Sequence, residues 1–207
     1  MNAPLKVRRT QAERSAETRS RVLEATVHCL YIHGYAATTT LLVAEVSGLS
    51  RGAMRHQFPA KTDLMLYTVR AVFDAEMEIY RERLSQLPDP LDKVLSLPEM
   101  IWDVLSRPSG VAVLEILQGS RSDPVLAERL APLQAQIERE SFAYLTSLQA
   151  RLGEVASPAM IRLVHWAIRG LSVGQLLTEN PREILDSVAL LRRMMAMVAA
   201  ETRRGSG

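Results

Sequence analysis

The chain has 207 residues, of which 47% are hydrophobic, 23% are charged and only 5% are aromatic. This composition suffices for a folded core, and the wealth of helix-forming residues without alternating β-rich runs predicts an all-α fold of about nine helices. A single cysteine excludes an intramolecular disulfide and suits a reducing cytosol. No apolar run could span a bilayer and no signal-peptide pattern opens the chain, so we expect a cytoplasmic protein without a membrane partner.

The formal net charge of +2 is unevenly distributed. Residues 1–61 carry nine basic and four acidic side chains, a net +5, which leaves −3 for the remainder. A cationic N-terminal part suits attraction to nucleic-acid phosphates. We call the mildly acidic remainder, residues 62–207, the body. Residues 1–12 are predicted to form a flexible basic arm that could become ordered on DNA.

The first predicted helix covers about residues 13–33, and Cys29 lies in its apolar stripe as a small core residue. A short helix over residues 40–47 follows. Thr39 or Thr40 can serve as its N-cap, because a threonine hydroxyl accepts from a free amide of the first helical turn.

The next residues predict a tight turn and a second short helix. Gly48 can adopt the left-handed conformation that ends a helix, and Ser50 can cap a helix over residues 51–57. Pro59 stops that helix, since the residue before proline is biased out of helical geometry. Two short helices joined in this way predict a helix-turn-helix, whose second helix enters the DNA major groove. The same pattern alone also fits an ordinary helical hairpin with a solvated basic face.

A longer pattern surrounds this pair. It runs without a gap through Arg21-Val22-Leu23-Glu24-Ala25, Gly34-Tyr35, Thr39, Val43-Ala44, Ser47-Gly48-Leu49-Ser50-Arg51-Gly52, Phe58, Lys61 and Leu64. In order and spacing, residues 19–65 resemble the DNA-binding domain of the TetR family of bacterial transcription regulators. The resemblance implies a three-helix DNA-binding domain over residues 13–60. It also implies a helical effector-binding and dimerisation domain over residues 61–207, whose first helix links the two.

The second short helix carries the candidates for base recognition. Long basic and amide side chains suit the edges of guanine and adenine. The candidates are Arg51, Gly52, Arg55, His56 and Gln57. The chain departs from the family at Arg55, where tyrosine is common, at Gln57, where histidine is common, and at Leu30, where phenylalanine is common. The base contacts of a relative therefore do not transfer.

Thr39, Thr40, Ser50 and Lys61 are candidates for anchoring the DNA backbone. Lys61 opens a helix predicted over residues 61–86, where a cation is unfavourable against the helix dipole. A nearby phosphate would remove that penalty.

Two long helices are predicted near the C-terminus, over residues 158–177 and 181–203. The first is apolar on two sides, so one side needs a cover beyond its own domain. The resemblance implies that this cover is a second copy, since family members dimerise through these helices as a four-helix bundle; an internal core helix is the alternative. The candidates are Ile161, Trp166, Gly170, Val173, Gly174, Leu177, Val188, Leu191 and Met195.

The middle of the chain supplies apolar residues for a ligand pocket, although simple core packing explains most of them. The pocket candidates are Met100, Trp102, Leu105, Leu114, Leu117, Gln118, Phe142, Tyr144, Leu145 and His165. We find no phosphate loop, no zinc or other metal motif and no nucleophile elbow, so neither an enzyme nor a cofactor is expected.

The sequence thus favours a homodimeric repressor that a small, largely apolar effector releases from a near-palindromic DNA operator. Two alternatives stay open. One is a helical module that binds a small molecule or a protein and uses its N-terminal domain only structurally. The other is a DNA-binding regulator without a ligand.

Overall fold

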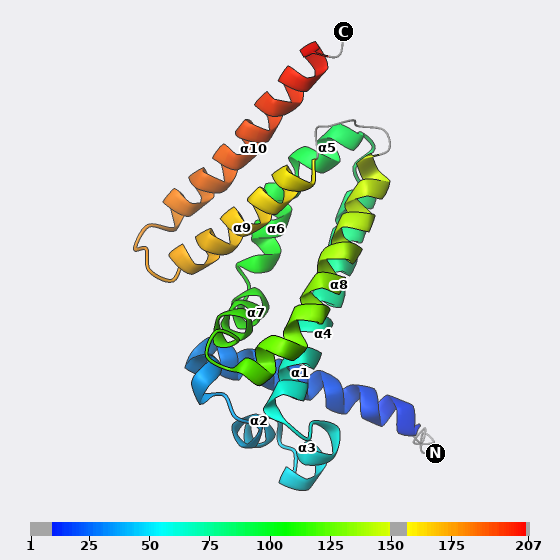
Figure 1. The fold of residues 1–207 in the computed structure, drawn as a ribbon, viewed down its shortest axis with the longest axis vertical. Helices are drawn as coiled ribbons and strands as arrows, with labels where there is room; N and C mark the ends of the chain where they lie inside the picture. The colour runs from blue at the N-terminus through cyan, green and yellow to red at the C-terminus, as the bar shows by residue number, and fades with distance from the viewer. Residues whose placement is uncertain (1–9, 150–156, 206–207) are drawn as a thin grey trace, which may run out of the picture.

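The computed structural model describes residues 10–149 and 157–205, the side chains of 11–14, 145–149 and 202–205 excepted. The described residues form helices joined by short turns and loops, without a strand, which confirms the all-α prediction (Figure 1). Ten helices are found among the described residues, where about nine were expected, and Ser96 separates two short consecutive helices. They are α1 (Gln11–Ala37), α2 (Thr40–Ser47), α3 (Arg51–Gln57), α4 (Lys61–Ser85), α5 (Pro90–Leu95), α6 (Leu97–Leu105), α7 (Pro108–Gly119), α8 (Pro124–Gln149), α9 (Pro158–Gly174) and α10 (Pro181–Gly205).

Helices α2 and α3 have the predicted bounds, and the predicted caps are in place. The Thr39 hydroxyl accepts from the Leu42 amide at 3.1 Å, and the Ser50 hydroxyl accepts from the Ala53 amide at 3.2 Å. Between the two helices, Gly48 adopts φ 66°, a left-handed conformation that glycine reaches without a steric penalty. Thr39 thereby sets the start of α2, and Gly48 and Ser50 set the turn from α2 into α3.

Two hydrophobic cores organise the fold. The first joins α1–α3 to α4, α7 and α8, through buried residues such as Leu30, Met54, Leu64 and Ile116. The second joins α5 and α6 to α9 and α10. Because the first core continues from α3 into α4, the predicted division at residue 60 marks no gap in the packing. Figure 1 shows α2 and α3 at one end of the molecule and α10 toward the other.

Two features of the helices differ from what the sequence favours. The helix break that an internal proline favours does not occur at Pro132, because α8 runs from Pro124 to Gln149. Helix α9 ends at Gly174, three residues before the predicted end.

The predicted basic arm falls almost wholly on residues 1–9, which lie outside the described residues. No helix among the described residues has the length and apolar character needed to cross a membrane.

Tyr35, near the end of α1, connects the N-terminal helices to the body through several hydrogen bonds. Its amide donates to Glu115 of α7 at 3.0 Å, and its hydroxyl donates to Asp123 at 2.7 Å. Lys61, the first residue of α4, donates to the Tyr35 carbonyl at 2.6 Å, and its ammonium lies 3.8 Å from the centre of the Tyr35 ring. We call these four residues the Tyr35 junction.

Gly119 makes room for the Tyr35 ring, since a methyl group there would come within 2.3 Å of a ring carbon. We therefore expect Gly119→Ala to displace Tyr35 and to lower the free energy of unfolding by about 1–3 kcal/mol. The matched control is Gly52→Ala, where an added methyl meets nothing within 4 Å. That control should be neutral or stabilising by up to about 1 kcal/mol. Urea denaturation measures both, and equal effects of the two substitutions would contradict the close packing at Gly119.

Candidate DNA-binding surface and body cavity

Helix α3 presents a basic surface to solvent. Arg51, Arg55 and His56 are exposed, and Gly52 leaves open space beside the backbone. The opposite side of α3 is held by Met54 and Phe58, which are 2% and 7% exposed. The long basic side chains therefore project from a helix whose backbone is anchored in the core, a geometry suited to reading base edges in a groove.

Two of the predicted DNA contacts have other surroundings than expected. Gln57 is half-buried, and its Oε1 is buried without a hydrogen-bond partner in the described structure. The Lys61 ammonium donates to the Tyr35 carbonyl. The carbonyl of α1, and not a DNA phosphate, therefore compensates for the unfavourable cation at the start of α4. Burial lowers the pKa of Lys61, an effect that the charge of Asp123 opposes. Thr39 and Ser50 are exposed beside α3, and Thr40 is half-buried.

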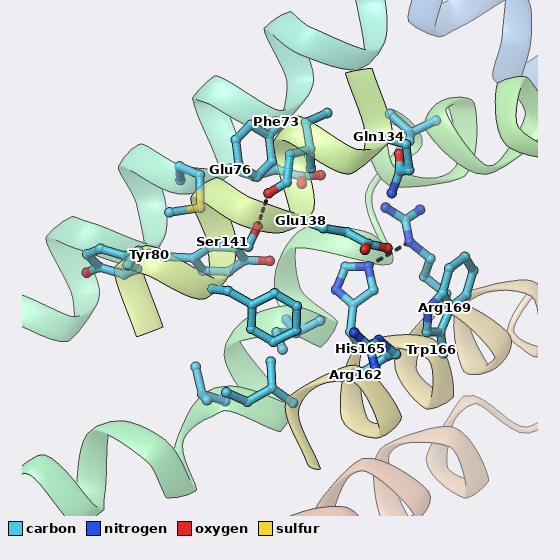
Figure 2. A pocket seen from close by; sticks show the side chains of 18 of the residues that line it. Phe73, Glu76, Tyr80, Gln134, Glu138, Ser141, Arg162, His165, Trp166 and Arg169 are labelled. Atoms are coloured by element: carbon cyan, nitrogen blue, oxygen red, sulfur yellow. Dashed lines mark hydrogen bonds between the residues drawn. The ribbon is translucent and has the colours of Figure 1, made fainter. Parts of the chain in front are cut away.

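A cavity of about 130 Å³ lies within the body, lined by side chains from α4, α6, α7, α8 and α9. Figure 2 shows Phe73, Glu76 and Tyr80 entering it from α4, and His165, Trp166 and Arg169 from α9. Most of the lining is apolar or aromatic. This is the usual composition of a small-molecule site, in which a few polar groups provide orientation.

Burial shifts the pKa values of two polar groups in the cavity, Glu76 and His165. Glu76 is 9% exposed, and its Oε1 has no hydrogen-bond partner in the described structure. Burial raises the pKa of Glu76 to about 7, although the charges of Arg169 and Arg107 oppose this shift. Arg169 is 8% exposed, and its Nε donates to Nε2 of His165 at 3.0 Å. Burial, together with the Arg169 charge, lowers the pKa of His165 to about 3, which fits its role as a neutral acceptor.

Only part of the predicted pocket set reaches this cavity. Phe142, Tyr144 and His165 line it, and the side chain of Leu145 lies outside the described part of the structure. The helical phase of α6 and α7 turns different residues inward, namely Ile101 and Val113. The predicted residues that do not line the cavity are Met100, Trp102, Leu105, Leu114, Leu117 and Gln118.

The sequence analysis missed Glu76 and Arg169. A signal was available, because each is a charged residue within an apolar helical stripe. Glu76 continues the stripe of Val69, Val72 and Phe73 on α4, and Arg169 follows Ile161 and His165 on α9. Such a charge is costly to bury and marks a candidate functional site.

The predicted interface residues divide between two faces of α9 and α10. Ile161, Val188 and Met195 are buried inside the protomer, so they cannot form a surface for a partner. Leu191 is half-buried against the same core, and Val173 and Gly174 are half-buried. Trp166 and Leu177 are exposed, and a methyl group at Gly170 would meet nothing within 4 Å. The remaining exposed apolar residues of the two helices and the loop between them are Leu163, Leu176, Leu185, Leu190, Met194, Met197 and Val198.

Among the described residues, no group of three or more His, Cys, Asp or Glu side chains could hold a metal ion. Cys29 is fully buried, and burial raises the pKa of its thiol, as expected for a core residue.

The chain is similar in sequence to known bacterial transcription regulators. The family model described as "Bacterial regulatory proteins, tetR family" matches residues 22–68. The chain is 30% identical over 174 residues to the HTH-type transcriptional regulator CymR of Pseudomonas putida, covering 82% of this chain and 84% of CymR. It is 26% identical over 183 residues to the HTH-type transcriptional repressor AcnR of Corynebacterium glutamicum, covering 85% and 93% of the two chains.

Solved structures agree in fold. A TetR family transcription regulator from Marinobacter aquaeolei superimposes with a TM-score of 0.66 at 21% identity, over 88% of this chain and 97% of that one. The similarity to CymR extends far beyond the helix-turn-helix into the body. The protein therefore belongs to the tetR family and is a DNA-binding transcription regulator, not an enzyme.

Proposed function

We propose that the protein is a homodimeric repressor of the bacterial cytoplasm, released from its operator by a small molecule in the body cavity. The exposed basic surface of α3 is the observation that supports DNA binding. Ser50 caps the N-terminus of this helix, and Met54 and Phe58 hold its inner side in the core. Repression is supported by AcnR, which is named as a repressor.

We propose that Arg51, Arg55 and His56 contact bases or phosphates, with Thr39, Thr40 and Ser50 at the backbone. Two such helices, about one DNA turn apart in a two-fold dimer, would read a near-palindromic site. Lys61 has a partner within the protein, so we leave it out of this proposed surface.

The exposed apolar side of α9 and α10 supports the dimer. Trp166, Leu177 and Met197 are 49%, 83% and 65% exposed in the isolated chain. A concentration of large apolar side chains on one helix pair marks an interaction site, and Gly170 would allow a second helix to approach closely.

Helix α4 supports ligand control. It begins at Lys61 in the Tyr35 junction and lines the cavity further along, at Val69, Phe73, Glu76 and Tyr80. A ligand that prefers a shifted α4 would favour the state that does not bind DNA. The cavity, with the buried unpaired Oε1 of Glu76, favours this function over a regulator that senses nothing.

Selection from a pool of random duplexes, at a stated salt concentration near physiological, tests the function as a whole. We expect a near-palindromic operator to be enriched. Recovery of nothing above background would contradict the proposed reading role of α3.

On that operator, Arg55→Ala should weaken specific binding by about 1–3 kcal/mol, because a base or phosphate contact is lost. Fluorescence anisotropy with labelled duplex measures the change, and sedimentation should show an unchanged assembly. Arg182→Ala is the matched control, an equal loss of charge at an exposed residue at the start of α10. Equal affinities of wild type and Arg55→Ala would exclude Arg55 from the contact.

A charge at Gly170 should dissociate the proposed dimer without unfolding the protomer, since the added side chain enters open space. Sedimentation equilibrium of Gly170→Glu should give the protomer mass, with an unchanged helical circular dichroism spectrum. Gln86→Glu, which adds a charge at an exposed residue after α4, should leave the mass unchanged. A dimer mass for Gly170→Glu would place the interface elsewhere.

Glu76 predicts a pH dependence of stability. Its folded pKa of about 7 exceeds the ordinary value of 4.5, so the folded protein favours the neutral acid. The associated cost is absent below about pH 4.5, grows as the pH rises and levels off above about pH 7. Glu76→Gln removes this cost and should therefore gain stability relative to wild type between pH 5 and pH 8, by up to about 3 kcal/mol. Urea denaturation at the two pH values checks this; a pH-independent difference would mean that the carboxyl group is hydrated.

A further inference from the structure

We propose that the cavity recognises a small organic monoanion, namely a carboxylate on an apolar body of about one six-membered ring, with Arg169 as the anion-binding group. This inference rests on the proposed function of the cavity as the effector site. It adds the chemical class of the effector and the residue that selects it.

The Arg169 guanidinium is buried and only partly hydrogen-bonded. The side chain is 8% exposed, and its one hydrogen bond among the described residues joins Nε to His165. Its two terminal nitrogens have no protein partner there, and it forms no ion pair with a described carboxylate. Arginine stays protonated in proteins and offers a planar fork that matches a carboxylate. The terminal nitrogens of Arg169 are therefore available to a ligand, while the nearby Glu76 stabilises the guanidinium charge without an ion pair.

His165 holds this group in position. Its Nε2 accepts from Arg169 one helical turn away, so the imidazole is neutral and the guanidinium is oriented from one side only. Figure 2 shows His165 and Arg169 side by side on α9, with Glu138 and Gln134 of α8 nearby. Glu138 lines the same cavity, but it is exposed and does not pair with Arg169 in the described structure.

Glu76 is the second polar group, and its protonation state sets the net charge around Arg169. Its carboxyl group is buried with Oε1 unpartnered, and burial raises its pKa to about 7, so the group readily takes up a proton. A neutral Glu76 can donate to a ligand oxygen, whereas Arg169 cannot lose its charge. Tyr80 of α4 also faces this part of the cavity, with a pKa that burial raises. An anion bound at Arg169 would favour the protonated form of Glu76, and with Glu76 and His165 neutral one negative charge on the ligand balances Arg169.

The size and lining of the cavity define the body of the ligand. The volume is about 130 Å³, and a dry engineered cavity of roughly 150 Å³ in another protein accommodates benzene. Aromatic walls, among them Phe73, Phe142 and Trp166, suit a flat ring. A ligand much larger than one ring would require the helices to separate.

Three probes of similar size and different charge test the proposal: benzoate, benzamide and benzylamine. Each is titrated into the full-length protein without DNA, near neutral pH, by isothermal calorimetry. We expect benzoate to bind at least about tenfold more tightly than the other two, because only the anion pairs with the guanidinium. Equal affinity for benzamide, preference for benzylamine or binding of none of the three would overturn the proposal.

Two substitutions with opposite expected effects locate the contact. Arg169→Gln should weaken benzoate binding by about tenfold or more. Glu76→Gln should preserve or strengthen it, because the amide keeps a hydrogen-bond donor and cannot ionise as the carboxyl group does near its pKa of about 7. Arg182→Gln, at an exposed residue of α10, is the control for lost positive charge. If Arg169→Gln fails to fold, the Glu76→Gln result still decides, since weaker benzoate binding by that variant contradicts the assignment.

These titrations are independent of operator binding. Loss of benzoate binding with an intact operator interaction would reject only the ligand class. Benzoate binding by a protein that selects no DNA would instead reject the proposed repressor.

Discussion

The side chain and backbone of Tyr35 connect the DNA-reading helices to the body. The amide bonds to Glu115, the hydroxyl to Asp123, and the carbonyl accepts from Lys61. These contacts tie the end of α1 to α7, to the start of α8 and to the start of α4. Because each bond crosses between helices distant in sequence, a displacement of α4 or α7 cannot leave the position of α1 unchanged. The Gly48 turn and its two capped helices then follow α1 as one unit.

The body contains a second constraint, an incompletely compensated set of buried charges. Glu76 and Arg169 both face the cavity, yet they form no ion pair with each other in the described structure. Burying such groups costs free energy, and a protein without a use for them would be more stable with apolar residues of similar size. Their presence on α4 and α9 brings the proposed ligand site into contact with the helix that enters the Tyr35 junction.

Local chemistry made the N-terminal helices predictable from sequence. Thr39, Gly48 and Ser50 act through neighbouring backbone groups, so their spacing alone gives the bounds of α2 and α3. The direction of Lys61 was not predictable, since its partner lies 26 residues away on α1. The cavity also depends on the rotation of α6 and α7 about their axes, which selected Ile101 and Val113 over neighbouring apolar residues. On α9 and α10, apolar side chains occupy both faces, and only packing distinguished the buried Met195 from the exposed Met197.

The central claim is that operator binding at α3 reaches the body through the Tyr35 junction. Backbone amide hydrogen exchange, measured with and without a selected operator duplex, tests it directly. We predict slower exchange over residues 40–57 and also over residues 115–126, which include Glu115 and Asp123 and belong to the body. Protection confined to residues 40–57 would contradict the account, because the reading helices would then bind DNA without any response in the body.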